Sequence, residues 1–233
     1  MHDDVCAIAL DKGTSLVIIP FYKRFHANGA LKSSKKTIQI ANQNFLDKAP
    51  CSVAILIDRG ALKTQNAIRA CRYSYEVAVI FLGGADDREA LTLGARMVGC
   101  PNINLTLIRT LYDGNFPDYY MEGRRLDNEV LNEFRTNISR NYCAKYIEES
   151  VMNGADTASV LRNLENHYEL VVVGRRHDDD GLSPLLSGLR EWNENRELGV
   201  IGDLLASSDF LGNTTILVVQ QHTEYSHGER NEI

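Results

Sequence analysis

Residues 170–180 read LVVVGRRHDDD, in which two arginines and a histidine follow a short apolar run. The run ends at Gly174, and Arg175, Arg176 and His177 come directly after it. A guanidinium group binds phosphate through two parallel hydrogen bonds, and a glycine lets the backbone approach an anion closely. In many α/β proteins a phosphate binds just past such a strand. The stretch therefore leaves two alternatives, a nucleotide site or the edge of a sheet that turns into solvent.

The elements that must position these residues are short apolar runs that alternate with helix-like segments. Most of the runs are continuous Val, Ile and Leu, which is typical of strands covered on both faces. Strand, helix and strand in succession predict an α/β fold with a doubly wound parallel sheet. The predicted strands are Leu16–Pro20, Val53–Ile57, Val77–Leu82, Leu105–Ile108, Tyr146–Val151, Leu170–Val173 and Thr215–Val219. The predicted helices are Asp86–Met97, Asn128–Asn137 and Ala155–Asn166, and residues Asp113–Arg125 are predicted to form a loop.

An internal repeat relates the two ends of the chain. A shift of about 154 positions places Leu16–Ile19 on Leu170–Val173. The same shift places a preceding helical face on another, namely Cys6, Ala7 and Leu10 on Val160, Leu161 and Leu164. Each copy continues with a polar loop, a helix and a final strand: Ile38–Lys48 and Val53–Ile57 in the first, Gly199–Ser207 and Thr215–Val219 in the second.

Only the second copy is preceded by a complete β–α–β–α–β stretch, so the first copy is incomplete. We expect a partial unit at residues 1–60, a linker at 61–75, a complete unit at 76–221 and a disordered tail at 222–233. The two strands of the partial unit need neighbours, because an unpaired edge invites association. They can join the complete sheet, pack as a second layer or pair with another chain.

Composition restricts the classes of function. The formal charge of −6 gives no electrostatic reason to expect nucleic acid or an anionic membrane surface as a partner. The five cysteines are scattered without a CxxC motif, which predicts free thiols in a reducing compartment and no zinc or other metal site. No apolar run is long enough to cross a bilayer, and no secretory signal peptide is visible. No arrangement of catalytic residues can be assigned, so we expect no enzyme.

Four segments resemble the universal stress protein fold. They are VAVIFLGGADDREALTLGARM (Val77–Met97), NLTLIRTL (Asn104–Leu111), YELVVVG (Tyr168–Gly174) and TTILVVQ (Thr214–Gln220). The resemblance covers nearly the whole second unit, although each motif alone is common in α/β proteins. It implies a Rossmann-like sheet with the strand order 3-2-1-4-5, to which the first unit adds an incomplete copy.

Longer stretches resemble the cytosolic C-terminal region of plant cation/proton exchangers, the CHX family. They include APCSVAILIDRG (Ala49–Gly60), VIFLGGADDREALTLGARM (Val79–Met97) and ELGVIGDLLASSDF (Glu197–Phe210). The resemblance implies a soluble regulatory or assembly domain on the cytosolic face of a membrane antiporter that exchanges K⁺ or another monovalent cation for H⁺, with a role in cation and pH homeostasis. The implied partners are the antiporter's own membrane domain, a second copy in a homodimer, and regulatory proteins. The transport residues of the family lie in the membrane domain, outside this sequence.

In that strand order, a ligand crevice is predicted where the order reverses, between strands 77–82 and 170–173. Its lining would be Gly83, Gly84, Gly174, Arg175 and Arg176. The helix that starts near Asp86 would point its free N–H groups into the same crevice, which favours an anion or nucleotide.

The residues depart from the nucleotide-binding pattern of the stress proteins at three places. Gly83 stands where those proteins carry an aspartate, His177 replaces the second glycine of Gly-x-x-Gly, and Val200 follows Gly199 in place of a serine or threonine. The aspartates 178–180 would also repel phosphate. These departures favour a chain without a cofactor. A nucleotide-sensing domain is the alternative, and a small nucleotide-acting enzyme of the same fold superfamily is a weaker one.

Other residues leave alternatives open. His177 is either a pH-sensing regulatory residue or a plain surface histidine. The aspartates 178–180 either hold a hard cation or form a solvated loop. Arg59, in the sequence Asp-Arg-Gly, either forms a salt bridge at the junction between the units or marks a simple strand exit. Trp192 either anchors the long loop 178–198 on the protein or meets a partner.

Overall fold

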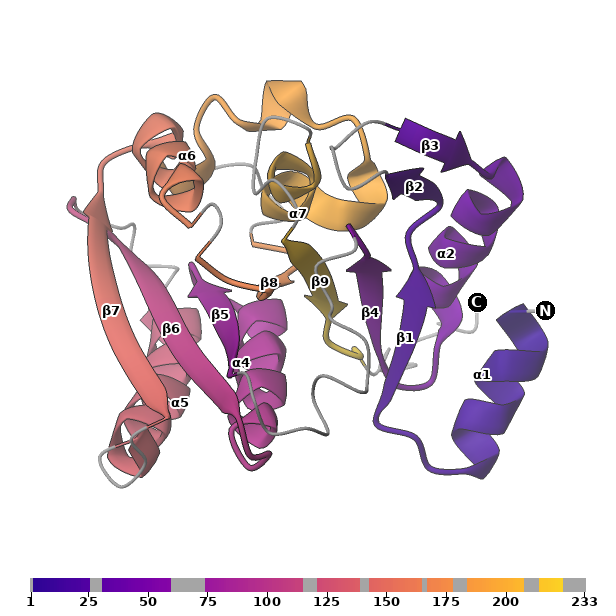
Figure 1. The fold of residues 1–233 in the computed structure, drawn as a ribbon, viewed down its shortest axis with the longest axis horizontal. Helices are drawn as coiled ribbons and strands as arrows, with labels where there is room; N and C mark the ends of the chain where they lie inside the picture. The colour runs from indigo at the N-terminus through magenta and orange to yellow at the C-terminus, as the bar shows by residue number, and fades with distance from the viewer. Residues whose placement is uncertain are drawn as a thin grey trace, which may run out of the picture.

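A seven-stranded sheet forms the centre of the protein in the computed structural model (Figure 1), which describes residues 2–25, 31–59, 74–114, 121–138, 143–164, 167–177, 184–207 and 214–223. The order of its strands is β1-β4-β9-β8-β5-β6-β7. The strands are β1 (Leu16–Pro20), β4 (Ser52–Ile57), β5 (Tyr75–Phe81), β6 (Ile103–Tyr112), β7 (Ala144–Val151), β8 (Leu170–Gly174) and β9 (Thr215–Gln220). A separate antiparallel pair consists of β2 (Lys23–Phe25) and β3 (Leu31–Ser34), which the sequence did not predict.

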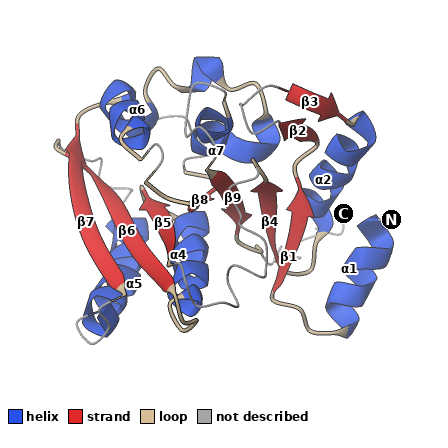
Figure 2. Cartoon of the chain, viewed as in Figure 1, coloured by secondary structure: helices blue, strands red, loops and turns tan. Residues whose placement is uncertain are grey.

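Helices cover both faces of the sheet (Figure 2). One face packs against α1 (His2–Asp11), α2 (Lys36–Lys48), α6 (Gly154–Arg162) and α7 (Gly199–Ala206), and the other packs against α4 (Ala85–Met97) and α5 (Met121–Ile138). Three short 3-10 helices lie within the predicted long loop, at η2 (Pro184–Leu186), η3 (Arg190–Trp192) and η4 (Arg196–Leu198). Helix α5 begins earlier than predicted, because Arg125 pairs with Glu122 and Glu129 at helical spacing over its first turns.

The strands of the complete unit lie in the predicted order. The order β9-β8-β5-β6-β7 is the predicted 3-2-1-4-5 read from the opposite edge, and these five strands are parallel. The continuous apolar run of β8 has the expected cause, since Val171, Val172 and Val173 are fully buried between the two layers of helices.

The incomplete first unit joins the complete sheet, which decides among the three alternatives. Strand β1 pairs with β4 in parallel, and β4 pairs with β9 antiparallel. The last strands of the two repeats therefore meet at a single seam. Two neighbouring pairs in this seam are Ile55↔Val218 and Leu56↔Leu217. The repeat correspondence, which places Ile55 on Leu217 and Leu56 on Val218, exchanges these two pairs, so the two units are related by an approximate two-fold axis through the seam.

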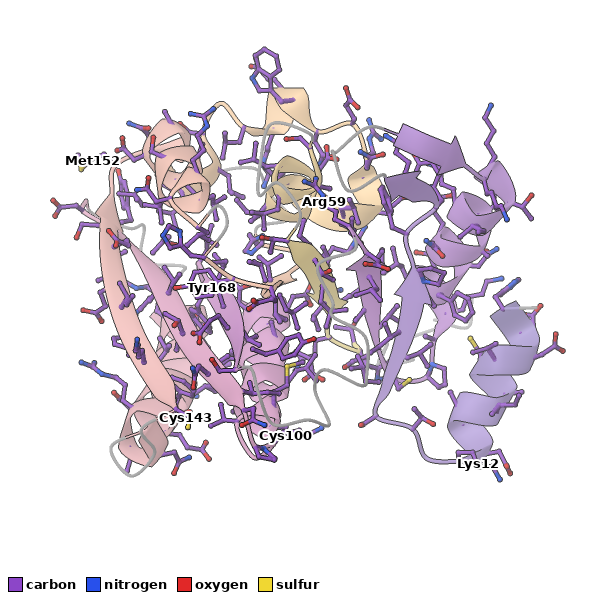
Figure 3. All side chains as sticks on the ribbon, in the orientation of Figure 1. Lys12, Arg59, Cys100, Cys143, Met152 and Tyr168 are labelled. Atoms are coloured by element: carbon purple, nitrogen blue, oxygen red, sulfur yellow. The ribbon has the colours of Figure 1, made fainter. Side chains whose placement is uncertain are left out.

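At or just past the end of each seam strand, one side chain binds a helix of the opposite unit. Arg59, labelled in Figure 3, lies past the end of β4, and its Nη2 donates to the carbonyls of Leu205 (3.3 Å), Ala206 and Ser207 (2.6 Å) at the end of α7. Gln220, at the end of β9, donates from Nε2 to the carbonyl of Leu46 near the end of α2 (2.7 Å). Helix ends leave carbonyls without partners and carry partial negative charge, which the buried Arg59 guanidinium compensates. Arg59 therefore does lie at the junction between the units, where it donates to carbonyls at the end of α7.

Replacing Arg59 by methionine should destabilise the whole sheet, because three carbonyls at the buried end of α7 would lose their donor. We expect Arg59→Met to lower the free energy of unfolding by about 2–4 kcal/mol, measured by chemical denaturation. The matched control is Arg125→Met, which removes exposed ion pairs with Glu122 and Glu129 and should have a much smaller effect, because water screens surface charges. Equal effects of the two substitutions would show that Arg59 does not hold the seam.

Candidate functional site

The predicted crevice lies where β5 and β8 end side by side. The two strands are in register up to the pair Ile80↔Val173, and α4 begins directly after Gly83 and Gly84. Both glycines have positive φ values, +130° and +100°, which let the chain turn sharply from the strand into the helix. Gly84 is the N-cap of α4, so the aspartates at 86 and 87 lie in the first helical turn.

The side chain of Asp87 occupies the centre of this crevice. Its Oδ2 accepts hydrogen bonds from the backbone N–H groups of Leu82 (2.7 Å) and Gly83 (2.9 Å) at the end of β5. Its Oδ1 accepts from the N–H of Gly174 at the end of β8 (2.8 Å). The carboxylate is fully buried, so these three donors satisfy a charge that would otherwise be very costly to remove from water.

The side chain of Asp86 forms a second buried anion beside the first. Arg176 donates to Oδ2 from its backbone N–H (2.8 Å) and Nε (2.9 Å), and to Oδ1 from Nη2 (2.7 Å). The N–H of Gln221 also donates to Oδ1 (2.8 Å). The guanidinium thus binds the carboxylate through two parallel hydrogen bonds, as arginine also binds a phosphate.

The strand-end amides and the Arg176 guanidinium, which could hold an external anion, therefore bind carboxylates of the chain itself. The structure brings Gly83, Gly174 and Arg176 together as predicted, and all three donate to Asp86 or Asp87. A phosphate entering the same position would displace two buried negative charges or lie against them, and like charges at this distance repel strongly at low dielectric.

Gly174 has a packing role at this point. A Cβ on Gly174 would lie 2.7 Å from the backbone nitrogen of Asp87 and closer still to its carboxylate. The start of α4 can approach β8 only because residue 174 has no side chain. The closeness of helix and strand thus accounts for a glycine that the sequence alone associated with phosphate.

Arg175 is the predicted lining residue whose side chain points elsewhere. Its Nε donates to the carbonyl of Glu197 (2.8 Å), Nη1 to Oε1 of Gln220 (2.9 Å) and Nη2 to the carbonyl of Arg196 (3.2 Å). Burial lowers the pKa of this guanidinium from its usual value. Arg175 holds the η4 segment against the end of β9, whereas Arg176 turns toward the crevice.

Asp127 of α5 closes the crevice from the other side, and sequence reasoning missed it. Both of its carboxylate oxygens lie 3.2 Å from the donating N–H of Gly84, and Arg88 of α4 forms a buried ion pair with it. Burial raises the pKa of Asp127, and the hydrogen bond from Arg88 opposes that rise. No local pattern marks this residue, because its partners lie about 40 positions earlier in the chain.

His177 is buried rather than exposed, with 2% of its side chain accessible. Its Nε2 lies 3.2 Å from Oδ1 of Asp87. Burial lowers the pKa of the imidazole, but the charge of Asp87, the hydrogen bond to it and the charge of Asp86 outweigh burial and the opposing charge of Arg190, so the net pKa is raised. Within the described parts of the chain, Nδ1 has no hydrogen-bond partner.

A cavity of about 210 Å³ adjoins the crevice at the ends of β5 and β6. The residues that line it include Phe81, Leu111, Arg109, Arg124 and His177, and most of its surface is apolar. It leaves room for a small molecule beside the carboxylates.

Three other predictions concern metals, membranes and the tryptophan. The aspartates 178–180 lie outside the described residues, and the described residues contain no group of three or more His, Cys, Asp or Glu side chains that could hold a metal ion. None of the helices in the described ranges is long and apolar enough to cross a membrane. Trp192 is 78% exposed, so it does not anchor the loop on the protein.

Comparison with known proteins gives the same family along almost the whole chain. Residues 74–220 match the family model described as plant cation/H⁺ antiporter, C-terminal domain, and residues 1–61 match the plant cation/H⁺ antiporter domain. Cation/H⁺ antiporter 15 of Arabidopsis thaliana is 40% identical over 95% of this chain and 29% of its own length. Cation/H⁺ antiporter 10 of the same plant is 41% identical over 96% of this chain and 28% of its own length. The chain thus spans less than a third of the length of these relatives.

The solved structures that the chain resembles are universal stress proteins. One from Archaeoglobus fulgidus superposes with a TM-score of 0.47 at 13% identity, over 94% of this chain and 65% of that one. UspA from Lactobacillus plantarum superposes with a TM-score of 0.41 at 9% identity, over 64% of this chain and 99% of that one. The matches to the two family models and to the Arabidopsis relatives show that the chain belongs to the plant cation/H⁺ antiporter family.

Proposed function

We propose that this chain is a non-enzymatic regulatory and assembly domain at the cytosolic face of a membrane antiporter, which exchanges K⁺ or another monovalent cation for H⁺. It acts on transport through contacts with the membrane domain, with a second copy and with regulatory proteins. Family membership supports the attachment to a cation/H⁺ antiporter. The chain spans less than a third of each matched relative. Most of each relative, which would include the transport unit, therefore lies outside the matched region.

The observation that carries a non-catalytic role is the crevice filled by Asp86 and Asp87. A catalytic or nucleotide-binding site of this fold needs free donors at the strand ends. Here those donors are committed to the two carboxylates at 2.7–2.9 Å. The crevice therefore works as a fixed joint between β5, β8 and α4, and it is suited to transmit force or position between the surfaces of the domain.

The cavity beside the crevice favours one alternative, a domain that senses a nucleotide or its base. The cavity has an apolar wall and two arginines, Arg109 and Arg124, on its rim. Against it stand the amides of Leu82, Gly83 and Gly174 at the neighbouring strand ends, which donate to Asp87 at the place where the phosphates of a nucleotide would be held.

His177 supplies a route by which proton concentration could reach this joint. It pairs with Asp87, which in turn holds the ends of β5 and β8 through three backbone amides. The charged groups that face it are Asp86 and Asp87 of α4 and Arg190 of η3, and Arg109 and Asp127 share its cavity. A loss of charge on His177 leaves Asp87 without its cationic neighbour, which loosens the joint.

Deleting this region from the full antiporter should change cation/H⁺ exchange, membrane targeting or abundance, measured by ion flux, imaging and immunoblotting in the same cells. Trp192→Ala should alter flux without changing abundance, because an exposed tryptophan contributes to contacts with a partner rather than to folding. Arg125→Ala is the matched control, since this exposed arginine pairs only within its own helix surface, and it should behave as the wild type. Deletion without any change in the three readouts would contradict the proposal.

Calorimetry separates the interaction domain from the nucleotide sensor. Titration of the purified chain with ATP, ADP and AMP should give no binding tighter than about 1 mM, because the donors are occupied. Turnover of ATP should likewise be absent. Micromolar binding that disappears in Arg109→Ala, and persists in the Arg125→Ala control, would instead establish the nucleotide-sensing alternative at the cavity.

The His177–Asp87 pair should make stability depend on pH in one direction. Since the pKa of His177 is raised on folding, its stabilising contribution is complete below the unfolded value of about 6.5 and is lost as the pH rises through the folded value. We expect the difference in unfolding free energy between the wild type and His177→Gln to shrink as the pH rises above about 6.5. The matched control is His222→Gln, which makes the same substitution at an exposed position. A difference that grows with pH would mean that burial, rather than Asp87, dominates the titration of His177.

A further inference from the structure

Strand β7 lies at one edge of the sheet, and within the described residues its outer side is open. It pairs in parallel with β6 alone, and Figure 1 shows it at one end of the molecule. Lys145, Ile147, Glu148, Glu149 and Ser150 are all exposed. The open side of an edge strand presents a row of N–H and C=O groups with which another strand can pair.

Alternate residues of β7 direct their backbone groups to this open side. The N–H of Leu105 donates to the carbonyl of Cys143 (2.8 Å), and the N–H of Asp113 donates to the carbonyl of Val151 (3.1 Å). The odd-numbered residues of β7 therefore face β6, because the backbone groups of successive residues in a strand point to opposite sides. The even-numbered residues from 144 to 150 present their N–H and C=O groups to the open edge.

The odd-numbered side chains of β7 form a stripe of cation, apolar residue and anion, namely Lys145, Ile147 and Glu149. They share one face of the sheet, because Ala144 and Tyr146 pack on the other face, in the cluster that includes α4 and α5. Ile147 at the centre of the stripe is 39% exposed. A two-fold axis through Ile147 places Lys145 opposite Glu149 of a second copy, and Glu149 opposite Lys145 of that copy.

The hydrogen-bond pattern excludes the neighbouring registers. Two copies of β7 can pair antiparallel only where even-numbered residues lie opposite even-numbered residues, so that the open backbone groups of both strands meet. Lys145 therefore cannot lie opposite Glu148, and its pairing with Glu149 fixes the axis at Ile147. There, the two copies of Ile147 form a pair without mutual hydrogen bonds, with Cα atoms about 4.5 Å apart and side chains in close contact.

The opposite face of the strand has no conflict of charge in this register. Glu148 lies opposite Tyr146 of the second copy rather than opposite another acid. Within its own chain, Glu148 accepts a hydrogen bond from the hydroxyl of Tyr146 and lies 3.8 Å from Nη1 of Arg109. No two like charges face each other across the axis, on either face, between residues 144 and 150.

We propose that the β7 edge is a self-pairing surface, at which two copies of this chain join antiparallel about a two-fold axis at Ile147 and form one continuous sheet. Because the interface is symmetric, the Lys145–Glu149 pair occurs twice, once on each side of the axis. The inference deepens the proposed function, on which it rests for its role in the antiporter, by naming the surface that contacts the second copy.

Exchange of charges tests this register in the purified chain. Sedimentation equilibrium at about 0.1 mM should give a mass close to twice that of the chain, since one strand pair is a small interface that forms at high concentration. Lys145→Glu should weaken association at least about 10-fold, because it places two acids opposite each other on both sides of the axis, and Glu149→Lys should do the same with two lysines. The double variant should restore association, because it recreates both pairs of opposite charge.

Controls separate the interface from general effects of charge and folding. Lys12→Glu makes the same change of charge at an exposed lysine just past α1 and should leave association unchanged. Each variant should melt within about 2 °C of the wild type at low concentration, because the substituted residues are exposed. Recovery in the double variant cannot come from one chain, since residues 145 and 149 of a single strand lie about 13 Å apart.

Disulfide formation locates the axis. In a parent chain that carries Cys100→Ser and Cys143→Ser at the two exposed cysteines, Ile147→Cys should give a covalent dimer on mild oxidation, because the two Cα atoms lie within disulfide range. Glu149→Cys is the matched control on the same face. Its two copies would lie about 13 Å apart, so it should cross-link no more than the parent chain does.

A monomer at this concentration, or a dimer that the charge reversals leave intact, would overturn the proposal. So would a loss of association that the double variant does not restore, or cross-linking through Glu149→Cys in place of Ile147→Cys. These measurements do not involve transport, so their failure would leave the expected effect of deletion on the antiporter standing. An intact dimer together with an unchanged deletion phenotype would contradict the regulatory role alone.

Discussion

Every backbone N–H and C=O group that is buried at the end of a strand or helix needs a hydrogen-bond partner, and this constraint shapes the whole protein. At the ends of β5 and β8 the partner is the carboxylate of Asp87, which accepts from Leu82, Gly83 and Gly174. At the end of α7 the partner is the buried guanidinium of Arg59. In both cases a side chain from a distant or adjoining element supplies what a ligand, water or a longer helix would otherwise supply. At the two edges of the seven-stranded sheet, the described strands β1 and β7 each pair on one side.

The two units meet at the β4–β9 seam about an approximate two-fold axis. Their folds correspond there, but the side chains at the two ends of the seam differ in chemistry. The seam joins equivalent strands, so the two helix ends beside it pose the same problem of unpaired carbonyls. At the end of α7 the charged guanidinium of Arg59 donates to the carbonyls. At the end of α2 the side-chain amide of Gln220 donates to a carbonyl and also accepts a hydrogen bond from Arg175. Because Gln220 also accepts a hydrogen bond from Arg175, the seam is directly connected to the residue that precedes Arg176, the partner of Asp86.

The sequence was sufficient for the strands of the main sheet, but not for the β2–β3 pair, the start of α5 or the acceptors inside the crevice. Continuous Val and Ile runs predicted the strands, because burial on both faces leaves a direct mark on composition, whereas the order of the five parallel strands was implied by the resemblance to the universal stress protein fold. The site was predicted by position, and Gly83, Gly174 and Arg176 do meet there. What the sequence could not show is that Asp86 and Asp87, adjacent in one helical turn, reach residues about 90 positions away. The direction of Arg175 was equally hidden, since neighbouring residues after a strand point to opposite sides.

The balance of charge in the crevice gives the joint one adjustable component. Asp86 is neutralised by Arg176, whose charge does not change at any physiological pH, so that pair is fixed. Asp87 has three neutral amides and one titratable neighbour, His177. A change in the protonation of His177 therefore acts on the carboxylate that ties β5 to β8 and leaves the Asp86–Arg176 pair in place. The result is a small electrostatic change at the point where β5, β8 and α4 meet.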